Sequence, residues 1–470
     1  MKKQDKGLSV WQIVMLALGT VIGGSFFLGC SVAIHTAGPS VVIGFIFGGI
    51  LVYYILYALS EMTVANPGKG SFRAFASQAF GPGTGFVVGW TYWTGMVLAM
   101  SSEATAVSTL VREWLPNVSI AWLGSGIILA VTLLNLLGAS KLSKLESVLA
   151  GFKILAVLSF LLVSLLLIFG LFPGKAAVGL GALSREPLLP NGLTGLAGSM
   201  LVVMFTYAGF EIIGFTASET GNPQRTIPKA IQYTVISLVG LYVVFMFLLL
   251  PLVPTDQISE NSSPIVMALQ TNGLTWVGSA MNVVLITAIL STMLAAMFAL
   301  GRMMRSLADE NMAPNWLRDK GDVPYRGILC SGAAMLFALR SGLFFPRVYL
   351  FLISSGGFAL LVSYAVIMAT HIRLRRKHGC PPDGNCQMRG FPYTSVFVLV
   401  SLIAAIASMP FVKDQLSGLI AGVCLVAFYT ACYGITRYVK VRKRLHDYGS
   451  SRLAHAEFSK ELNDFDQDED

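Results

Sequence analysis

Three places in the sequence put polar or ionisable groups inside strongly apolar runs. Residues 19–25, GTVIGGS, hold three glycines and two hydroxyl residues where a plain membrane anchor would carry Leu, Ile or Val. Glu211 stands in the apolar run 205–214, FTYAGFEIIG, and Lys153 in the run 149–157, LAGFKILAV. An ionisable side chain at the centre of a bilayer costs roughly 2.5 to 3.5 kcal/mol on insertion scales, so each of these charges predicts a function.

The two glycine-containing runs predict interrupted helices. Glycine weakens a helix and lets the backbone approach a ligand closely. Where a helix is broken, the N–H groups and positive dipole end of its second half can hold a carboxylate, and the carbonyls of its first half can hold an ammonium. A zwitterionic amino acid fits this polarity. For residues 19–25 taken alone, a small-residue packing face between helices is an equally good interpretation.

The elements that position these groups must be membrane-spanning helices. Of the 470 residues, 55% are hydrophobic and only 12% are charged, against roughly 25% charged in soluble domains. Each span needs about 20 mostly apolar residues. The sequence therefore predicts an all-α integral membrane protein, with a short amphipathic helix over 263–272. Its twelve transmembrane helices are expected near 11–37, 40–60, 82–103, 120–138, 146–171, 194–217, 230–252, 274–303, 327–345, 348–372, 393–412 and 416–437.

The Lys and Arg residues predict the orientation of the chain. In this topology, 26 Lys and Arg residues lie on the same side of the membrane as the N-terminus, and five lie on the opposite side. Cytoplasmic loops carry the excess of positive charge, so both termini are expected in the cytoplasm of a multi-pass protein of the cell membrane. The net charge of +9 is spread over many loops, which argues against a nucleic-acid partner and leaves the lipid bilayer as the expected surrounding.

The two glycine-interrupted runs open successive groups of five spans, which is typical of an inverted-repeat transporter whose site lies at the midplane. We therefore expect five parts. They are a cytoplasmic N-terminus (1–10), a first repeat of spans 1–5 (11–171), a second repeat of spans 6–10 (194–372), spans 11–12 (393–437) and a cytoplasmic tail (438–470).

Several segments, in this order, resemble the amino acid transporter family of bacterial permeases, within the amino acid, polyamine and organocation superfamily. They are MLALGTVIGGSFFLG at 15–29, PGKGSF at 67–72, GWTYW at 89–93, FTYAGFE at 205–211, ETGNPQRTIPKA at 219–230 and RMMRSLA at 302–308. The resemblance implies the leucine-transporter-like fold, with two inverted five-helix repeats plus two added helices. It also implies uptake of a small-molecule amino acid driven by the proton as coupling ion, with no cofactor and no metal.

The resemblance further implies roles for the residues at matching positions. The amides at 23–25, with the hydroxyl of residue 25, would receive the substrate carboxylate. Carbonyls at 17–18, 205 and 208 would receive the ammonium, and the rings at 207 and 210 would line the side-chain pocket and the thin gate. The expected substrate-binding residues are Ala17, Leu18, Gly19, Ile22, Gly23, Gly24, Ser25, Phe205, Tyr207, Ala208 and Phe210, and the expected coupling and gating residues are Lys153 and Glu211.

Two interpretations of Lys153 stay open. It can extend its ammonium to the cytoplasmic interface, as long basic side chains often do. The resemblance favours the other interpretation, in which the ammonium takes the place of the second sodium ion of sodium-driven relatives, between the first, fifth and eighth helices. There it would load and release the coupling proton. Glu211 is the one acid expected at the depth of the substrate site.

The substrate side chain is expected to be neutral or hydrophobic. In the eighth span, residues 294–302 read LAAMFALGR, where the family usually shows Asn-Ser before an aromatic residue, so two polar pocket positions are apolar here.

An amino acid exchanger, or a permease for cationic amino acids or polyamines, is the main alternative, although a polyamine site should collect several acids. A channel fits the internal repeat less well. An enzyme is not expected, because the spans show neither a nucleophile with its base nor a metal-binding motif. The sequence makes no prediction of the oligomeric state.

Overall fold

The structure is a computed structural model that describes residues 8–65, 72–215, 220, 222–258, 262–319, 321, 323–380, 387–412 and 415–439. Over these residues it holds helices, turns and loops but no β-strand, so the predicted all-α class is confirmed. A helix lies at each of the twelve predicted spans. Within the described ranges, seven helical segments are long and apolar enough to cross a membrane, and α1, α7 and α9 are shorter apolar helices, so the count of twelve crossings stays a prediction.

The first predicted span is a broken helix, as its glycines indicate. It consists of α1 (Val10–Val21), the short α2 (Gly24–Phe27) and α3 (Gly29–Ala37). The start of α1 is fixed by a capping box, in which the Ser9 side chain accepts from the backbone of Gln12 and the Gln12 side chain accepts from the backbone of Ser9. The helix stops because Ile22, with φ −76° and ψ 97°, and Gly23, with φ −146° and ψ −159°, are both extended.

The sixth predicted span is broken in the same way. Helix α9 (Gly192–Thr206) is followed by a turn and then by α10 (Ile212–Phe215), beyond which residues 216–219 lie outside the described part of the chain. Gly209 stands in this turn with φ +105°, a conformation that favours glycine. A Cβ atom there would also lie only 3.0 Å from the carbonyl oxygen of Thr20, so the position needs glycine for two independent reasons.

Several helices extend beyond the limits that hydropathy predicts, because the residues next to the apolar run contain no glycine or proline to end the helix. The longest are α6, α8, α13 and α15, with 30, 30, 35 and 31 residues. The bounds are α4 (Val41–Ala65), α5 (Phe72–Phe80), α6 (Pro82–Val111), α7 (Ile120–Asn135), α8 (Ala139–Ile168), α11 (Pro223–Leu249), α12 (Pro264–Thr271), α13 (Thr275–Asp309), α14 (Tyr325–Gly342), α15 (Val348–His378), α16 (Tyr393–Ser408) and a last helix Leu416–Val439. The expected short helix before the eighth span is α12.

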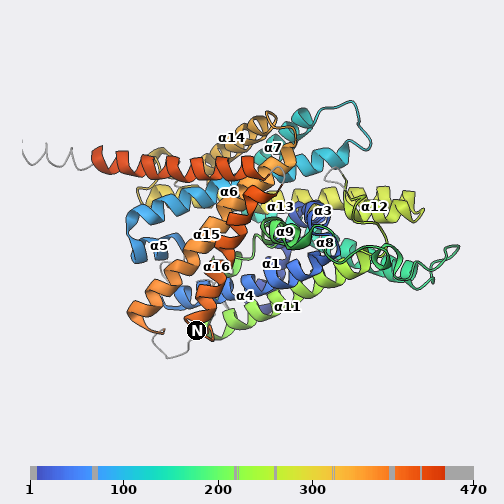
Figure 1. Ribbon diagram of the computed structural model, residues 1–470. Helices are drawn as coiled ribbons and strands as arrows, with labels where there is room; N and C mark the ends of the chain where they lie inside the picture. The colour runs from blue at the N-terminus through green and yellow to red at the C-terminus, as the bar shows by residue number, and fades with distance from the viewer. Residues whose placement is uncertain are drawn as a thin grey trace, which may run out of the picture.

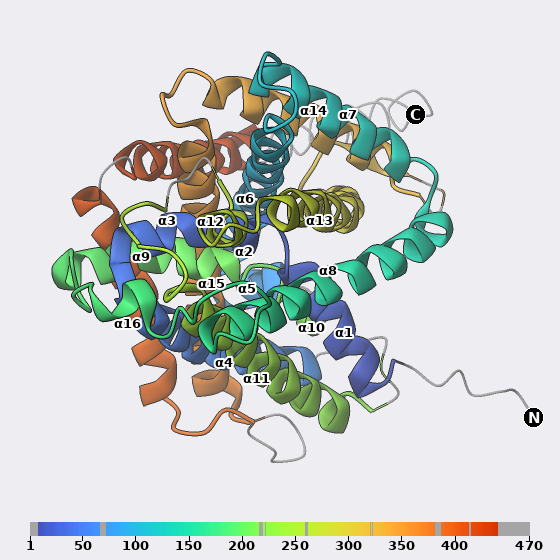
Figure 2. The same cartoon turned by 90° about the vertical axis from the view of Figure 1, so that its right-hand side faces the viewer.

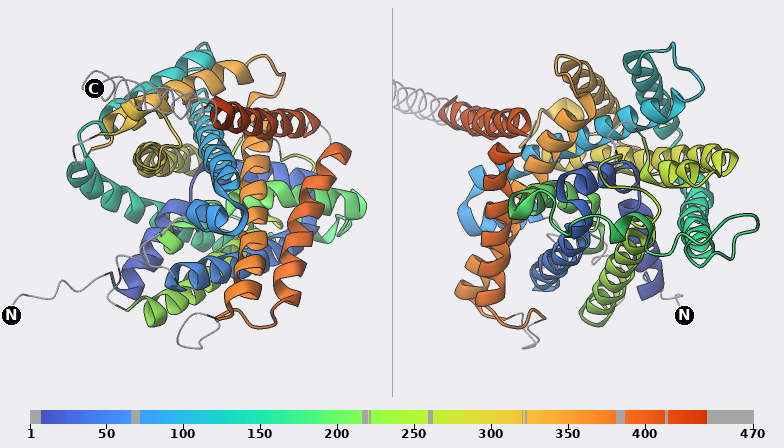
Figure 3. Two further views of the ribbon diagram at one scale, coloured as in Figure 1. Left: turned by 90° about the vertical axis from the view of Figure 1, so that its left-hand side faces the viewer. Right: turned by 45° about the vertical axis from the view of Figure 1, so that its right-hand side comes forward.

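The helices pack as two groups that meet at the breaks. In Figures 1 and 2, α1, α4 and α11 lie alongside one another, and α6, α7, α13 and α14 form a second group across from them. Helix α15 packs along α6, and α9 packs against α3. The last helix, red in Figure 3, lies at the edge of the molecule and is mostly exposed, as expected of a peripheral helix covered by lipid.

Candidate functional site

The break in the first span binds a carboxylate that belongs to the protein itself. The amide of Gly24 donates to Oε2 of Glu103 at 3.1 Å, and the amide of Ser25 donates to Oε1 of the same residue at 3.0 Å. Glu103 projects from α6 and is only 2% exposed. These are amides that the sequence assigns to a substrate carboxylate. The geometry therefore establishes that the backbone at the start of α2 can bind a carboxylate with two hydrogen bonds.

A buried ammonium binds the same broken helix on its other side. Nζ of Lys153, on α8, donates to the carbonyl oxygen of Gly19 at 2.8 Å and to Oγ1 of Thr292, on α13, at 2.8 Å. Lys153 is 1% exposed, so its ammonium does not extend to the aqueous interface. It lies between α1, α8 and α13, which are the first, fifth and eighth of the predicted spans.

Glu103 and Lys153 thus place a carboxylate and an ammonium on one interrupted helix. The two charges are close enough to interact electrostatically. Such opposite charges stabilise one another strongly where water is excluded. An α-amino acid also carries one carboxylate and one ammonium. The amides that Glu103 occupies are of the kind that binds a carboxylate, and the carbonyl that Lys153 occupies is of the kind that binds an ammonium.

Glu103 is a candidate site residue that the sequence did not predict. The third span was expected to end at residue 103, which would leave this acid at the membrane surface and Glu211 as the one acid at the depth of the site. That expectation is wrong, because α6 continues to Val111 and two further turns cover Glu103. The sequence holds one signal that could have found it, since residues 101 to 111, SSEATAVSTLV, contain no glycine or proline to end the helix.

Glu211 lies at the second break and is held by hydroxyl groups. Tyr92 on α6 donates to Oε1 at 2.6 Å, Tyr364 on α15 donates to Oε2 at 3.3 Å, and the amide of Gly209 donates to Oε2 at 3.1 Å. Glu211 is 2% exposed. The ring of Phe210 packs against that of Tyr364, with centroids 5.1 Å apart. This acid therefore connects the broken sixth span to α6 and α15.

The two breaks also touch each other through their backbones. Oγ1 of Thr20 donates to the carbonyl oxygen of Gly209 at 3.3 Å, besides its bond to the carbonyl oxygen of Ala17 at 3.0 Å. Helix α1 and the turn after α9 are therefore in direct contact.

The remaining predicted site residues have other partners in this structure. The carbonyl oxygens of Leu18 and Phe205 accept from the backbone amides of Ile22 and Ala208 at 3.1 Å each. The carbonyl oxygen of Ile22 accepts from Thr292 at 3.4 Å. Tyr207 is fully buried and donates to the carbonyl oxygen of Phe45, on α4, at 2.9 Å. These groups line the junction of the two breaks, and Tyr207 is directed toward α4.

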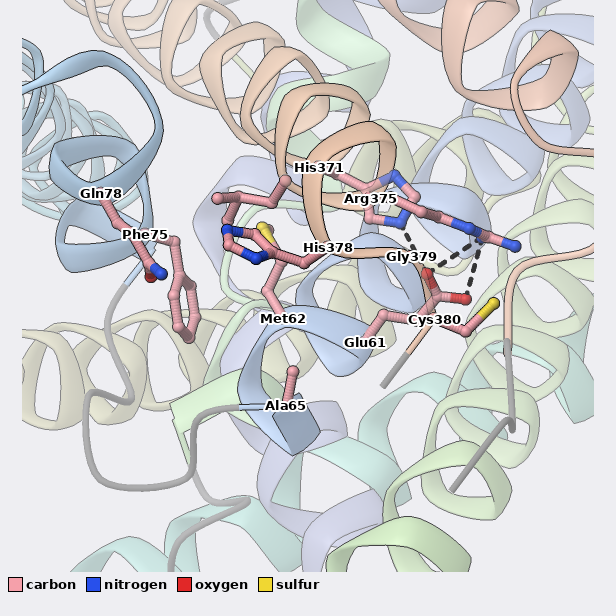
Figure 4. Close-up of a pocket in the computed structure, with 11 residues that line it drawn as sticks. Glu61, Met62, Ala65, Phe75, Gln78, His371, Arg375, His378, Gly379 and Cys380 are labelled. Carbon is pink, nitrogen blue, oxygen red and sulfur yellow. Dashed lines mark hydrogen bonds and ion pairs between the residues drawn. The ribbon is translucent and has the colours of Figure 1, made fainter. Parts of the chain in front are cut away.

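A second cluster of charged groups surrounds a cavity of about 330 Å³ at one end of α15. Figure 4 shows Glu61 of α4 facing His371 and Arg375 of α15 across its base. The carboxylate of Glu61 lies 2.7 Å from Nε2 of His371 and accepts from Nη1 of Arg375 at 3.0 and 3.1 Å and from the amide of Met388. These bonds join α4, α15 and the segment before α16 to one another.

Comparison with known proteins identifies relatives over nearly the whole chain. A family model described as amino acid permease matches residues 12–448. The gamma-aminobutyric acid permease of Bacillus subtilis (strain 168) is 30% identical over 435 residues, which cover 90% of this chain and 92% of that protein. The aromatic amino acid transport protein AroP of Escherichia coli O6:H1 is 32% identical over 375 residues, which cover 79% of this chain and 82% of that protein.

A solved structure has the same fold. The crystal structure of MhsT in complex with L-phenylalanine matches with a TM-score of 0.54 and 15% sequence identity, and the match covers 89% of this chain and 100% of that one. The predicted leucine-transporter-like fold is therefore confirmed.

Proposed function

The chain belongs to the amino acid permease family, and from that premise we propose that it imports a neutral amino acid with an apolar side chain across the cell membrane by proton symport with alternating access. The expected orientation, with both termini in the cytoplasm, is part of this proposal. The observation that carries it is the pair of amides at the start of α2, which bind the Glu103 carboxylate where a substrate carboxylate is expected.

Glu103 supplies a simple means of coupling. While Glu103 is ionised, its carboxylate holds the amides of Gly24 and Ser25 and excludes a second carboxylate from them. Once a proton neutralises Glu103, its charge-assisted hydrogen bonds become weaker, and the substrate carboxylate replaces it with the full negative charge. Proton binding and substrate binding then favour one another, and each amino acid enters with a proton.

Lys153 and Glu211 complete the proposed machinery. The resemblance implies that Lys153 loads the coupling proton, but we propose instead that its ammonium keeps a positive charge beside the carboxylate position and fixes the carbonyl oxygen of Gly19, while Glu103 takes up the proton. Glu211 is bound by hydroxyl groups on α6 and α15, so a change at the second break reaches both helix groups. The substrate ammonium would bind carbonyl groups at the junction of the two breaks.

The apolar character of the substrate side chain is supported by the residues beside α2. A Cβ atom placed on Gly24 would lie 3.1 Å from Ile289 of α13, so an aliphatic side chain faces the carboxylate position. Residues 294–302 of the same helix are apolar apart from Arg302. The relative AroP is an aromatic amino acid transport protein, and the crystal structure of MhsT, which has the same fold, contains L-phenylalanine.

The proposal is tested by uptake into proteoliposomes that contain the purified protein. Labelled leucine, phenylalanine, proline and lysine are supplied with an inward proton gradient, an inward sodium gradient, or no gradient. We expect accumulation of a neutral amino acid with the proton gradient alone. Uptake that requires unlabelled amino acid inside, whatever the gradient, would establish an exchanger and overturn the proposed symport. Preferential uptake of lysine would overturn the apolar pocket.

A further inference from the structure

Tyr242 touches both broken helices. It lies on α11, is fully buried, and stacks its ring on Phe26 of α2 with centroids 4.1 Å apart and planes 6° from parallel. Its hydroxyl donates to the carbonyl oxygen of Thr206 at 3.1 Å. Thr206 is the last residue of α9, so the hydroxyl binds at the second break while the ring packs at the first.

Each of these contacts holds a part of the proposed substrate site. Phe26 directly follows Ser25, whose amide binds the Glu103 carboxylate, so the ring stack limits how α2 can turn. The carbonyl groups in the last turn of a helix have no partner within the helix, and a buried carbonyl needs one from outside. The Tyr242 hydroxyl supplies it for Thr206, between the carbonyls expected to receive the substrate ammonium.

The surrounding rings fix the position of Tyr242. The ring of Phe245, one turn along α11, lies 4.8 Å from Phe26, and the rings of Phe45 and Tyr207 lie 5.6 and 5.0 Å from Tyr242. Side chains packed on several sides have few rotamers available. The distance between the α2 amides and the end of α9 is therefore spanned by one rigid side chain.

We propose that Tyr242 is a positioning residue that sets the separation between the carboxylate position at α2 and the ammonium position at the end of α9, and thereby selects α-amino acids over amino acids whose charged groups are further apart. This inference rests on the proposed function, since it assumes that an amino acid binds across the two breaks. The ring and the hydroxyl act together, because each of them holds a different break.

The test compares the binding of an α-amino acid with that of a γ-amino acid. Purified full-length protein is loaded with the labelled amino acid that the wild type transports. Unlabelled leucine and γ-aminobutyrate then compete for it. Tyr242→Phe removes the hydroxyl and keeps the ring stack, and Phe26→Leu removes the stack and keeps the hydroxyl. Tyr429→Phe is the matched control, because it removes another buried hydroxyl, which bonds Thr94 at 2.6 Å away from the breaks.

We expect Tyr242→Phe and Phe26→Leu each to weaken leucine binding by about fivefold to tenfold, the effect of losing one hydrogen bond or ring contact. Binding of γ-aminobutyrate should change less than twofold, so the ratio of the two affinities falls. Tyr429→Phe should keep the wild-type ratio. Equal weakening of both ligands in the two site variants would indicate general destabilisation and overturn the inference.

The outcome also separates this inference from the proposed function. If the wild type binds an α-amino acid but either site variant keeps the wild-type ratio, the positioning role fails and the proposed function stands. If the wild type binds no amino acid, the proposed function fails and the inference fails with it.

Discussion

Arg73 and Glu310 form a bidentate ion pair, with Nη1 and Nη2 of the guanidinium 2.5 and 2.6 Å from the two carboxylate oxygens. The Arg73 side chain is 2% exposed and that of Glu310 is 44% exposed. Arg73 lies on α5, which follows α4 of one helix group, and Glu310 ends α13 of the other group. The pair therefore fastens the connecting helix α5 to the group that contains α6 and α13.

Loss of this pair should weaken the fold more from the glutamate side than from the arginine side. Glu310→Gln leaves the buried Arg73 guanidinium without its anion, whereas Arg73→Ala removes the buried charge and leaves a half-exposed carboxylate that water can solvate. We expect Glu310→Gln to lower the free energy of unfolding by about 3 kcal/mol and Arg73→Ala, which also loses the hydrogen bond to Ser306, by about 2 kcal/mol. Thermal unfolding of the purified proteins ranks the two variants. A smaller effect of Glu310→Gln than of Arg73→Ala would contradict this order.

The Glu61 cluster should be among the most sensitive structural positions. Its buried carboxylate binds His371, Arg375 and the amide of Met388, so Glu61→Gln leaves the largely buried guanidinium of Arg375 without its anion. Breaking a buried ion pair from one side costs about 3 to 5 kcal/mol. We expect Glu61→Gln to lower the yield of folded protein in the membrane severely, as measured by fluorescence-detected gel filtration.

Glu186 provides a matched control for Glu61. It also accepts two hydrogen bonds, from the amide and the hydroxyl of Thr255 at 2.8 and 2.6 Å, but its partners carry no charge. Glu186→Gln should therefore have a much smaller effect on yield. If the two variants fold equally well, the Glu61 cluster is not needed to join α4 to α15.

Substitution of Glu103 should separate proton coupling from substrate binding. Glutamine resembles the neutral form of glutamate and cannot titrate, so Glu103→Gln should bind substrate with an affinity that no longer depends on pH. In the wild type, substrate affinity should rise as the pH falls, because protonation of Glu103 frees the amides of Gly24 and Ser25. Binding measured from pH 5 to pH 8 checks both expectations. A variant that keeps the pH dependence of the wild type would remove Glu103 from the coupling mechanism.

The two helix breaks could be predicted from the sequence because their signal is local. Glycines and polar residues inside apolar runs at 19–25 and 205–211 both indicate and explain the interruptions. The position of Lys153 between three helices was expected only from the family resemblance, because the residues around it also allow an ammonium that extends to the interface. The breaks themselves depend on a few neighbouring residues, and hydropathy and glycine content report them directly.

The contacts that complete the site could not be predicted in this way. Glu103 was placed at a helix end because hydropathy falls there, although the helix continues for eight more residues to Val111. The bond between Glu61 and His371 joins residues 310 positions apart, and no local pattern pairs them. Nothing in the sequence distinguishes Tyr242 from other aromatic residues of the apolar spans. Its contacts with both breaks are evident only in the fold.

Lys153→Ala should abolish accumulation driven by a proton gradient. The substitution removes the ammonium from the carbonyl oxygen of Gly19 and from Thr292, and it leaves Glu103 without a positive neighbour. Uptake against a gradient should fall to the level of empty liposomes. The control is Lys175→Ala, whose ammonium lies in the connection between α8 and α9 and is 3.5 Å from the carbonyl oxygen of Gly273. Proton-driven accumulation in Lys153→Ala would exclude the assigned role.

Gly209→Ala should impair transport even though it adds a single methyl group. The residue has φ +105°, and the new Cβ atom would lie 3.0 Å from the carbonyl oxygen of Thr20, which is backbone and cannot rotate away. A left-handed conformation costs an L-residue roughly 1 to 2 kcal/mol, and relief of the contact requires the two breaks to separate. We expect the initial rate of uptake to fall at least about tenfold, since each 1.36 kcal/mol of added barrier is a factor of ten.

Gly240→Ala, on α11, is the matched control, because nothing lies within 4 Å of its Cβ position and alanine is the better helix former. That variant should transport at the wild-type rate and unfold at an equal or higher temperature. If Gly209→Ala behaves in the same way, contact between the two breaks is not part of the transport cycle.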